Sequence, residues 1–231
     1  MHITLQFAPL WAYASYIETG ILLTIGLSLS AILLGTAIAV VLAGLRDIGA
    51  KPIGWLVDVY VELMRNTPFL VQLFMIFFGL PLLGLRMTGT EAALLAMTLN
   101  LAAYATEIIR AGVDSVHKSQ IEAGLSLALS RRQVFQYVIL PPAIGRVWPS
   151  LSSQFVLMLL ASSICSFISV PELSGAAAII EQRSFRSFEV YIIVTLTYLV
   201  LALTLKLVLI WLGTWLFPAT SGRRLTGGVA R

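Results

Sequence analysis

The sequence contains few charged residues and a single cysteine. Charged residues make up 11% of its 231 positions, whereas residues of the apolar set AVILMFWYC make up 58%. A soluble domain normally carries about 25% charged residues, so a water-soluble fold is excluded because it could not cover this much apolar surface. The single cysteine, Cys165, excludes a disulfide framework within the chain. It lies in an apolar run, which predicts a small buried side chain rather than a reactive thiol.

Histidine and phosphate-binding patterns are also missing. His2 and His117 form no metal-spaced cluster with carboxylates or with Cys165, and the chain has no glycine-rich loop of the kind that holds phosphates. We therefore expect no catalytic residue, no metal and no cofactor bound by this chain. The N-terminus lacks the basic stretch of a signal peptide, which predicts that the first apolar segment is retained.

Long apolar segments are what the sequence does contain. A bilayer core needs about 20 apolar residues of helix, and five segments qualify. They predict an all-α membrane protein with a single domain over residues 1–231. Glu107 and Arg110, three positions apart at the end of the third segment, are expected to pair. The five predicted spans are approximately 20–43, 66–83, 89–112, 147–171 and 190–212.

Lysine and arginine predict the orientation of the spans. If the segment after the first span is cytoplasmic, eleven basic residues lie on the inner side and three on the outer side, a clear positive-inside bias. The N-terminus would then be outside and the C-terminus in the cytoplasm. The inner set is Arg46, Lys51, Arg65, Arg110, Lys118, Arg131, Arg132, Arg146, Arg223, Arg224 and Arg231, and the outer set is Arg86, Arg183 and Arg186.

The segment before the second span, "KPIGWLVDVYVELMRNTP", has mixed polarity. Its apolar residues recur at helical spacing, which predicts a helix on or entering the inner interface. Asn66 or Thr67 is expected to cap the next helix, with Pro68 in its first turn, where a missing N–H costs nothing.

One long polar segment separates the third and fourth spans. Residues 116–142, called the two-helix loop below, include "QIEAGLSLALSRRQVFQYVILPP". Ile121, Leu125, Ala128 and Leu129 fall on one face of a first helix. Ala123 and Gly124 are small and would let another surface approach closely.

A second helix is expected to follow directly. Ser130 and Gln133 have the spacing of a capping box. The helix is predicted to stop at Pro141 and Pro142, which cannot donate backbone hydrogen bonds. Two short helices with a fixed bend suit docking into a groove of a soluble partner. The alternative from physics alone is an amphipathic hairpin lying on the lipid surface.

The same residues carry a resemblance to a known family. "QIEAGLSLALS…VILPPA" resembles the EAA loop of permease subunits of ATP-binding-cassette importers. "RNTPFLVQLFMIFFGLP" is similar to "RGTPLLVQLFFIYFGLP" of the polar amino acid subfamily, and "AAYATEIIRAGVDSVHKSQIEAG" to its "AAYxxEIxRGGIxSVxKGQxEAA". The likeness extends from about residue 20 to residue 209, and it implies the type I importer permease fold.

The resemblance implies a coupling role for the first helix of the loop, which would sit in a cleft of an ATPase subunit. Ala128 and Gly124 depart from the family pattern, and Ala128 is expected to favour helix where the family has glycine. The residues expected to couple to the ATPase are Glu122, Ala123, Gly124, Leu125, Ser130 and Arg131.

The resemblance also points to a substrate path. "SQFVLMLLASSICSFISVPEL" is similar to the family's "NQFxxLLKDSSLxSxIxxxEL", but Leu160 and Ala161 replace its Lys-Asp pair. This departure suggests that the chain is the less polar half of a heterodimer. Serines on a helix also bond to their own preceding turn, so a purely structural role stays open. The expected path residues are Glu18, Thr67, Ser162 and Ser163.

The resemblance implies a permease that imports polar amino acids across the bacterial inner membrane by alternating access. Its partners would be two ATPase subunits that bind ATP and Mg²⁺, a second permease chain, and an external amino-acid-binding protein, with no nucleic acid. One alternative is an ion-coupled secondary transporter, which would usually have more spans and buried mid-membrane carboxylates. An intramembrane enzyme is disfavoured because no nucleophile–base pair lies within the spans.

Overall fold

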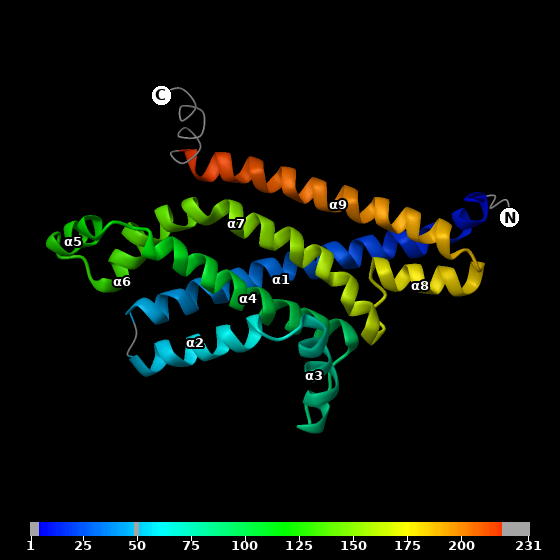
Figure 1. Cartoon of the computed structure of the whole chain (residues 1–231), viewed down its shortest axis with the longest axis horizontal. Coiled ribbons are helices and arrows are strands. Elements are labelled where there is room, and N and C mark those ends of the chain that lie inside the picture. The colour runs from blue at the N-terminus through cyan, green and yellow to red at the C-terminus, as the bar shows by residue number, and fades with distance from the viewer. Residues whose placement is uncertain (1–4, 49–50, 219–231) are drawn as a thin grey trace. The chain divides into compact units, whose positions relative to one another are not determined.

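The computed structural model describes residues 5–48 and 51–218, and within these ranges all regular structure is helical (Figure 1). Helices are expected for an apolar chain in lipid, because a helix satisfies its own backbone hydrogen bonds. His2, Arg223, Arg224 and Arg231, which entered the sequence predictions, lie outside the described residues. In chain order the elements are the 3-10 helix η1 (Ala8–Tyr13), α1 (Ala14–Ile48), α2 (Lys51–Arg65), α3 (Phe69–Leu82), α4 (Gly89–Asp114), α5 (Lys118–Ser126), α6 (Arg131–Gln133), the π-helix η2 (Val134–Ile139), α7 (Leu140–Ala161), the 3-10 helix η3 (Ser162–Ile168), α8 (Leu173–Ser184) and α9 (Ser187–Leu216).

Four helical stretches of the described chain are long and apolar enough to cross a membrane. They are Ala8–Asp47, Gly89–Asp114, Arg131–Ile168 and Ser187–Leu216. The helices α2 and α3 qualify only together, as a bent pair. The 14 residues of α3 extend only about 21 Å, less than the ~30 Å of a bilayer core. The five predicted crossings therefore correspond to four single helical stretches and one bent pair.

The bend between α2 and α3 differs from the sequence prediction. Pro68 is the residue at the N-cap of α3, and no side chain caps this helix. The Asn66 amide instead donates back to the Glu62 carbonyl and carboxylate at 2.8 Å. The Thr67 hydroxyl accepts a hydrogen bond from the Gln72 amide at 2.7 Å. The predicted cap by Asn66 or Thr67 is wrong, because both side chains are engaged by other local partners.

The chain divides into two compact units. The first consists of the residues up to Leu33, Thr67–Leu99 and Phe155–Thr204. The second consists of Leu34–Asn66, Asn100–Gln154 and the described residues from Leu205 onward. The helices α1, α4, α7 and α9 each contribute residues to both units, and each unit is described by itself below.

The core of the first unit joins η1, α8 and the first half of α9. Its buried members are Leu10, Leu173, Ala177, Ile180, Val190 and Val194. Tyr16, Ile17 and Ile21 of α1 pack against this cluster. The contact between α1 and α8 is close, because a Cβ atom on Gly20 would lie only 3.0 Å from the Leu173 Cα. The buried position of Cys165 in η3 confirms the prediction for that residue.

Charged pairs and a second core organise the second unit. Arg46 of α1 bonds to Asp58 of α2, with 2.8 Å between Nε and Oδ1. Glu107 and Arg110 form the predicted ion pair on α4. The core cluster comprises Val116, Val134, Phe135, Ile139 and Ala143, with partly buried neighbours that include Ile121, Leu129 and Val138. It lies within the two-helix loop and the helices on either side of it.

Candidate functional site

The first half of the two-helix loop is shorter than predicted. His117 caps α5, since its ring accepts a hydrogen bond from the Ser119 N–H. The helix ends at Ser126, so the predicted continuation through Ala128 and Leu129 is wrong.

The end of α5 has a defined geometry. Ala128 has φ of 59°, in the left-handed region that glycine favours. The Leu129 N–H donates to the Gly124 carbonyl at 3.3 Å, and the Ala128 N–H donates to the Leu125 carbonyl at 3.0 Å. This pair of bonds is a Schellman motif, in which the left-handed residue closes the last turn. Ala128 thus takes the backbone conformation of a glycine despite its higher helix propensity.

The second half of the loop begins as predicted and then continues. Ser130 and Gln133 form the predicted capping box. The predicted stop at Pro141 and Pro142 is wrong, because helical structure runs from Arg131 through η2 into α7. Both prolines lie at the start of α7, directly after η2, and have no N–H to donate to the preceding turn. The segment directly before them is the π-helix η2, and such turns are frequent at functional sites.

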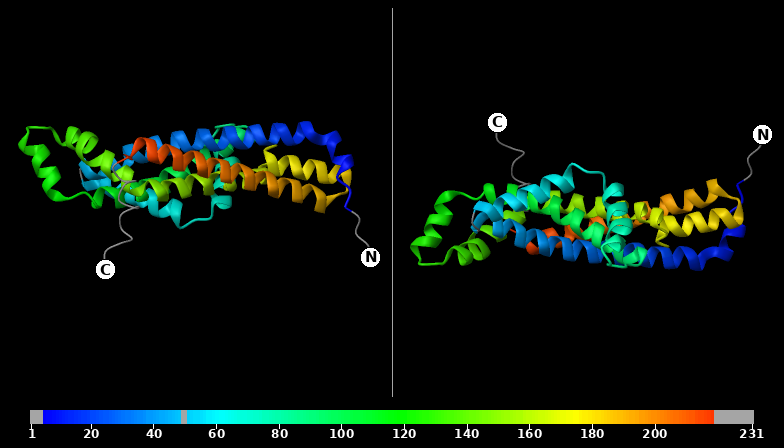
Figure 2. Two further views of the ribbon diagram at one scale, coloured as in Figure 1. Left: turned by 90° about the horizontal axis from the view of Figure 1, so that it is seen from above. Right: turned by 90° about the horizontal axis from the view of Figure 1, so that it is seen from below.

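The two halves pack on each other through a small core of their own. In both views of Figure 2, α5 lies alongside the helical segment that begins with α6. Gly124 is buried, and a Cβ atom there would lie 3.2 Å from a methyl group of Val134 and 3.3 Å from one of Val138. The small side chain at position 124 therefore permits close approach within the loop itself, and Gly124 does not face outward.

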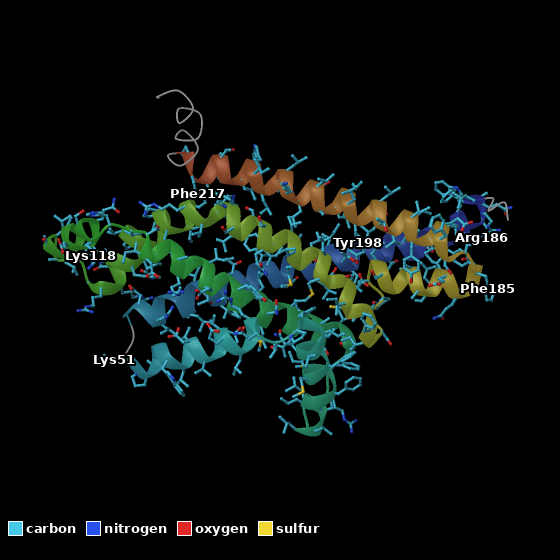
Figure 3. The ribbon with its side chains drawn as sticks, in the orientation of Figure 1. Lys51, Lys118, Phe185, Arg186, Tyr198 and Phe217 are labelled. Carbon is cyan, nitrogen blue, oxygen red and sulfur yellow. The ribbon has the colours of Figure 1, made fainter. Side chains whose placement is uncertain are left out.

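The outer side of the loop is open. Leu127 is 77% exposed and Tyr137 is 71% exposed, although both are large apolar side chains. Lys118, labelled in Figure 3, begins α5 and is exposed as well. Of the six residues predicted to couple to an ATPase, all but Gly124 are exposed, namely Glu122, Ala123, Leu125, Ser130 and Arg131.

The predicted substrate-path residues all belong to the first unit but differ in accessibility. Glu18 on α1 and Thr67 before α3 are exposed. Ser162 is fully buried, and its hydroxyl donates to the Leu159 carbonyl at 2.7 Å. The Ser163 hydroxyl donates to the Leu160 carbonyl at 2.7 Å and is partly exposed. Both serines thus bond to their own preceding turn, the structural alternative that the sequence left open.

The sequence prediction missed a buried polar cluster around Glu172. This residue is fully buried, and its side chain caps α8 by accepting from the Gly175 N–H at 2.9 Å. The same carboxylate accepts hydrogen bonds from Tyr198 of α9 and, at 3.4 Å, from Thr24 of α1. Tyr198 is labelled in Figure 3. The Thr24 hydroxyl also accepts from the Leu173 N–H at 3.1 Å.

The Glu172 cluster ties the start of α8 to two long helices of the first unit. A carboxylate removed from water is costly unless several donors replace its hydration, and three donors do so here. The sequence shows Glu172 only as the acidic residue of the "EL" pair. Its partners lie 148 and 26 positions away, so local patterns could not reveal the cluster. Among residues 5–48 and 51–218, no group of histidine, cysteine and carboxylate side chains could hold a metal ion.

Comparison with known proteins identifies related sequences. A family model described as the inner membrane component of binding-protein-dependent transport systems matches residues 31–222. The chain is 40% identical over 174 residues to the probable glutamine ABC transporter permease protein GlnM of Bacillus subtilis, covering 75% of this chain and 79% of that protein. It is 32% identical over 210 residues to the glutamine transport system permease protein GlnP of Escherichia coli K12, covering 88% and 94%.

Solved structures with the same fold are also found. A crystal structure of an amino acid ABC transporter with histidines matches with a TM-score of 0.82 and 34% identity, over 91% of this chain and 99% of that chain. An inward-facing structure of the MetNI methionine ABC transporter matches with a TM-score of 0.73 and covers 94% and 99%. Its 17% identity supports a likeness of fold only.

Proposed function

Because this chain belongs to the family of inner membrane components of binding-protein-dependent transport systems, we propose that it is the permease subunit of an ATP-binding-cassette importer that carries amino acids into the cell. The permease itself is not catalytic. The ion-coupled transporter considered from the sequence is not favoured, since the relatives are ABC transporter permeases.

The observation that carries the proposal is the preformed two-helix loop. A Schellman motif, a capping box and a common core fix the bend before any partner binds. Preorganisation lowers the entropic cost of association. Large apolar side chains are nevertheless left exposed on its outer side. A soluble partner that covers Leu127 and Tyr137 accounts for this combination.

The partner is an ATPase subunit that hydrolyses ATP with Mg²⁺. Glu122 supplies a negative charge on the exposed side of α5, and Ala123 beside it leaves room for close contact. Arg131 at the start of the next helix supplies a positive charge. Leu125 contributes apolar contact, while Ser130 and Gly124 maintain the bend and the internal packing. When two ATPase subunits close on ATP, they move this loop, and the spans rock to open the path outward.

The complete importer has further partners. It contains two ATPase subunits, a second permease chain that forms a heterodimer with this one, and an external amino-acid-binding protein. The chain is a multi-pass protein of the inner membrane, with its N-terminus outside and its C-terminus in the cytoplasm. The excess of lysine and arginine on the proposed inner side supports this orientation.

Amino acids are the substrate class, and the named relatives include two glutamine permeases. Glu18, Thr67 and Ser163 are exposed enough in this structure to line a path. Ser162 is fully buried, so it packs beneath the residues that line the path. With Leu160 and Ala161 in place of a charged pair, the second permease chain supplies most of the polar contacts to the substrate.

Purification in mild detergent tests the proposal. The tagged chain should elute with an ABC ATPase identified by mass spectrometry and with ATP hydrolysis. Reconstituted vesicles should import at least one labelled amino acid from a panel that begins with glutamine. Charge reversal by Glu122→Lys should remove the ATPase, whereas Gln120→Lys places a lysine on the same helix but keeps the Glu122 carboxylate and should keep the ATPase. Elution without any ATPase, or equal loss with both variants, would refute the proposal.

A further inference from the structure

The helix α3 of the first unit presents an apolar face that no described part of the chain covers. Large exposed side chains recur along it at i, i+4, i+7 and i+11, so they form one stripe on the helix. Leu73, which is fully buried, lies on the opposite side. One side of α3 therefore packs on its own unit while the other is left free. The α3 stripe comprises Val71, Met75, Phe78 and Leu82, which are between 49% and 87% exposed.

Gly79 leaves α3 open to close approach beside the stripe. It lies one turn after Met75, and a Cβ atom at this position would meet no described atom within 4 Å. Small residues on a membrane helix let the backbone of another helix come close. The free side of α3 thus combines bulky apolar side chains with one point where a second backbone can pack.

Contacts within the first unit indicate how deep the Glu172 cluster lies. The apolar run of α9 begins at Val190, directly after Glu189, and Tyr198 lies eight residues further along it. At ~1.5 Å per residue, Tyr198 is about 12 Å inside the apolar core. Because Tyr198 donates to the Glu172 carboxylate, the start of α8 lies at the same depth.

The connection between α3 and α4, residues 83–88, lies near this depth as well. The helix α4 begins at Gly89, where a Cβ atom would lie 2.8 Å from the Ile168 carbonyl oxygen and 3.5 Å from a methyl group of Val170. Val170 is two residues before Glu172. In Figure 1, α3 points away from α8, and the connection returns from its far end to α4. A non-helical stretch of backbone is therefore placed inside the apolar core.

Neither lipid nor water alone fits this connection. Irregular backbone at membrane depth is found only where protein or a water-filled cavity surrounds it. Arg86 is exposed and has no carboxylate partner among residues 5–48 and 51–218, and a charge at this depth is costly in lipid. Leu83 and Leu85 on either side are exposed too, which disfavours water. Another protein chain satisfies all three residues.

We propose that the α3 stripe and residues 83–88 form the contact surface for the second permease chain, which packs closest at Gly79 and supplies an acceptor for Arg86. The inference rests on the proposed function, because that function includes a second permease chain but does not say which helix meets it. The covering surface is membrane-embedded and mostly apolar, with a carboxylate or a free carbonyl opposite Arg86. Every residue that carries the inference belongs to the first unit.

Substitution at Gly79 tests the close approach. Gly79→Leu should fold as the wild type does, since a Cβ atom there meets no atom of its own chain. It should displace a neighbouring helix, so the amount of second permease chain that copurifies in mild detergent should fall about five-fold or more. Gly26→Leu on α1 is the matched control, because a Cβ atom there also meets no atom within 4 Å, and it should keep the second chain. Equal recovery with the two variants would overturn the inference.

The charge is tested separately. Arg86→Leu removes the group that needs an acceptor from the second chain and should lower its recovery about five-fold or more. Arg183→Leu is the control, since Arg183 is also exposed but donates to Tyr16 within the first unit. Full recovery with Arg86→Leu would overturn the assignment of residues 83–88 to the contact.

Photo-crosslinking does not depend on how the substituted helices assemble. A benzophenone on Met75→Cys, in native membranes, should give a covalent product of this chain with a second permease chain, identified by mass spectrometry as another copy or a related permease. The same label on Leu196→Cys, at an exposed position of α9 in the first unit, should give lipid products. Lipid products alone from the Met75 position would overturn the inference.

The wild type separates failure of this inference from failure of the proposed function. If it copurifies with no ATPase and imports no amino acid, the proposed function fails. If it assembles and imports, but the Gly79 variant and the Met75 label behave as their controls do, the inference alone fails.

Discussion

Replacing Ala128 by glycine should stabilise the two-helix loop, although glycine usually destabilises helical proteins. The residue has φ of 59° and is exposed, so the substitution removes no packing. An L-residue in this conformation costs ~1–2 kcal/mol. Glycine's greater freedom in the unfolded chain offsets about 0.4–1 kcal/mol of that gain. The net stabilisation expected for Ala128→Gly is about 0.5–1 kcal/mol.

Amide hydrogen exchange measures this stabilisation at the two-helix loop itself. The Leu129 amide, which donates to the Gly124 carbonyl, should exchange about two- to five-fold more slowly in Ala128→Gly after correction for its intrinsic rate. Ala123→Gly is the matched control, since it is the same substitution on the same loop but within α5. It should lose ~1 kcal/mol and exchange about five-fold faster. Faster exchange in both variants would refute the assignment of Ala128 to a Schellman motif.

Four further variants test the first unit. Tyr198→Phe removes a hydrogen bond to the buried Glu172 carboxylate and should lower the free energy of unfolding by about 1–3 kcal/mol, measured by thermal unfolding of the complex. Gly175→Ala places a Cβ atom 2.2 Å from a backbone carbonyl oxygen and should cost a further ~1–3 kcal/mol in the same assay. Ser163→Ala should raise the KM of import by about 2- to 10-fold, whereas Ser162→Ala should leave KM unchanged and lower the melting temperature.

Each of these variants has a control in the same chain. Tyr191 donates to Glu181 at the exposed surface, so Tyr191→Phe should change the melting temperature far less than Tyr198→Phe. Gly26→Ala, in open space, should not destabilise. Equal effects of the two tyrosine variants would contradict a special role for the Glu172 cluster. An unchanged KM in Ser163→Ala would remove that residue from the proposed path.

Local patterns in the sequence predicted much of the fold, because lipid imposes strong local rules. The apolar segments, the Ser130–Gln133 capping box and the Glu107–Arg110 pair depend on residues near one another in the chain, and the structure contains each of them. The helix through Pro141 and Pro142 was not predictable in this way. It continues through a π-turn directly before both prolines, and no periodicity in the sequence marks such a turn.

The same distinction between local and long-range contacts applies to the candidate sites. The exposed residues of the two-helix loop could be named from a short motif, whereas the inward position of Gly124 depends on how Val134 and Val138 pack. The conformation of Ala128 runs against its own propensity, because the Schellman hydrogen bonds and the packing of Leu129 require it. The Glu172 cluster joins α1 to α8 and α9 through partners 148 and 26 positions from Glu172, so only the tertiary structure could reveal it.

The central claim is that a separate ATPase drives conformational change in this permease by binding the two-helix loop. The most direct measurement is photo-crosslinking from Ala123→Cys labelled with a benzophenone, in native membranes, which is feasible because the native Cys165 is buried. The account predicts one covalent product with the mass of this chain plus an ABC ATPase, in a yield that changes when ATP is added. A product with lipid alone, or an ATPase product from a label on the opposite face of the membrane, would contradict it.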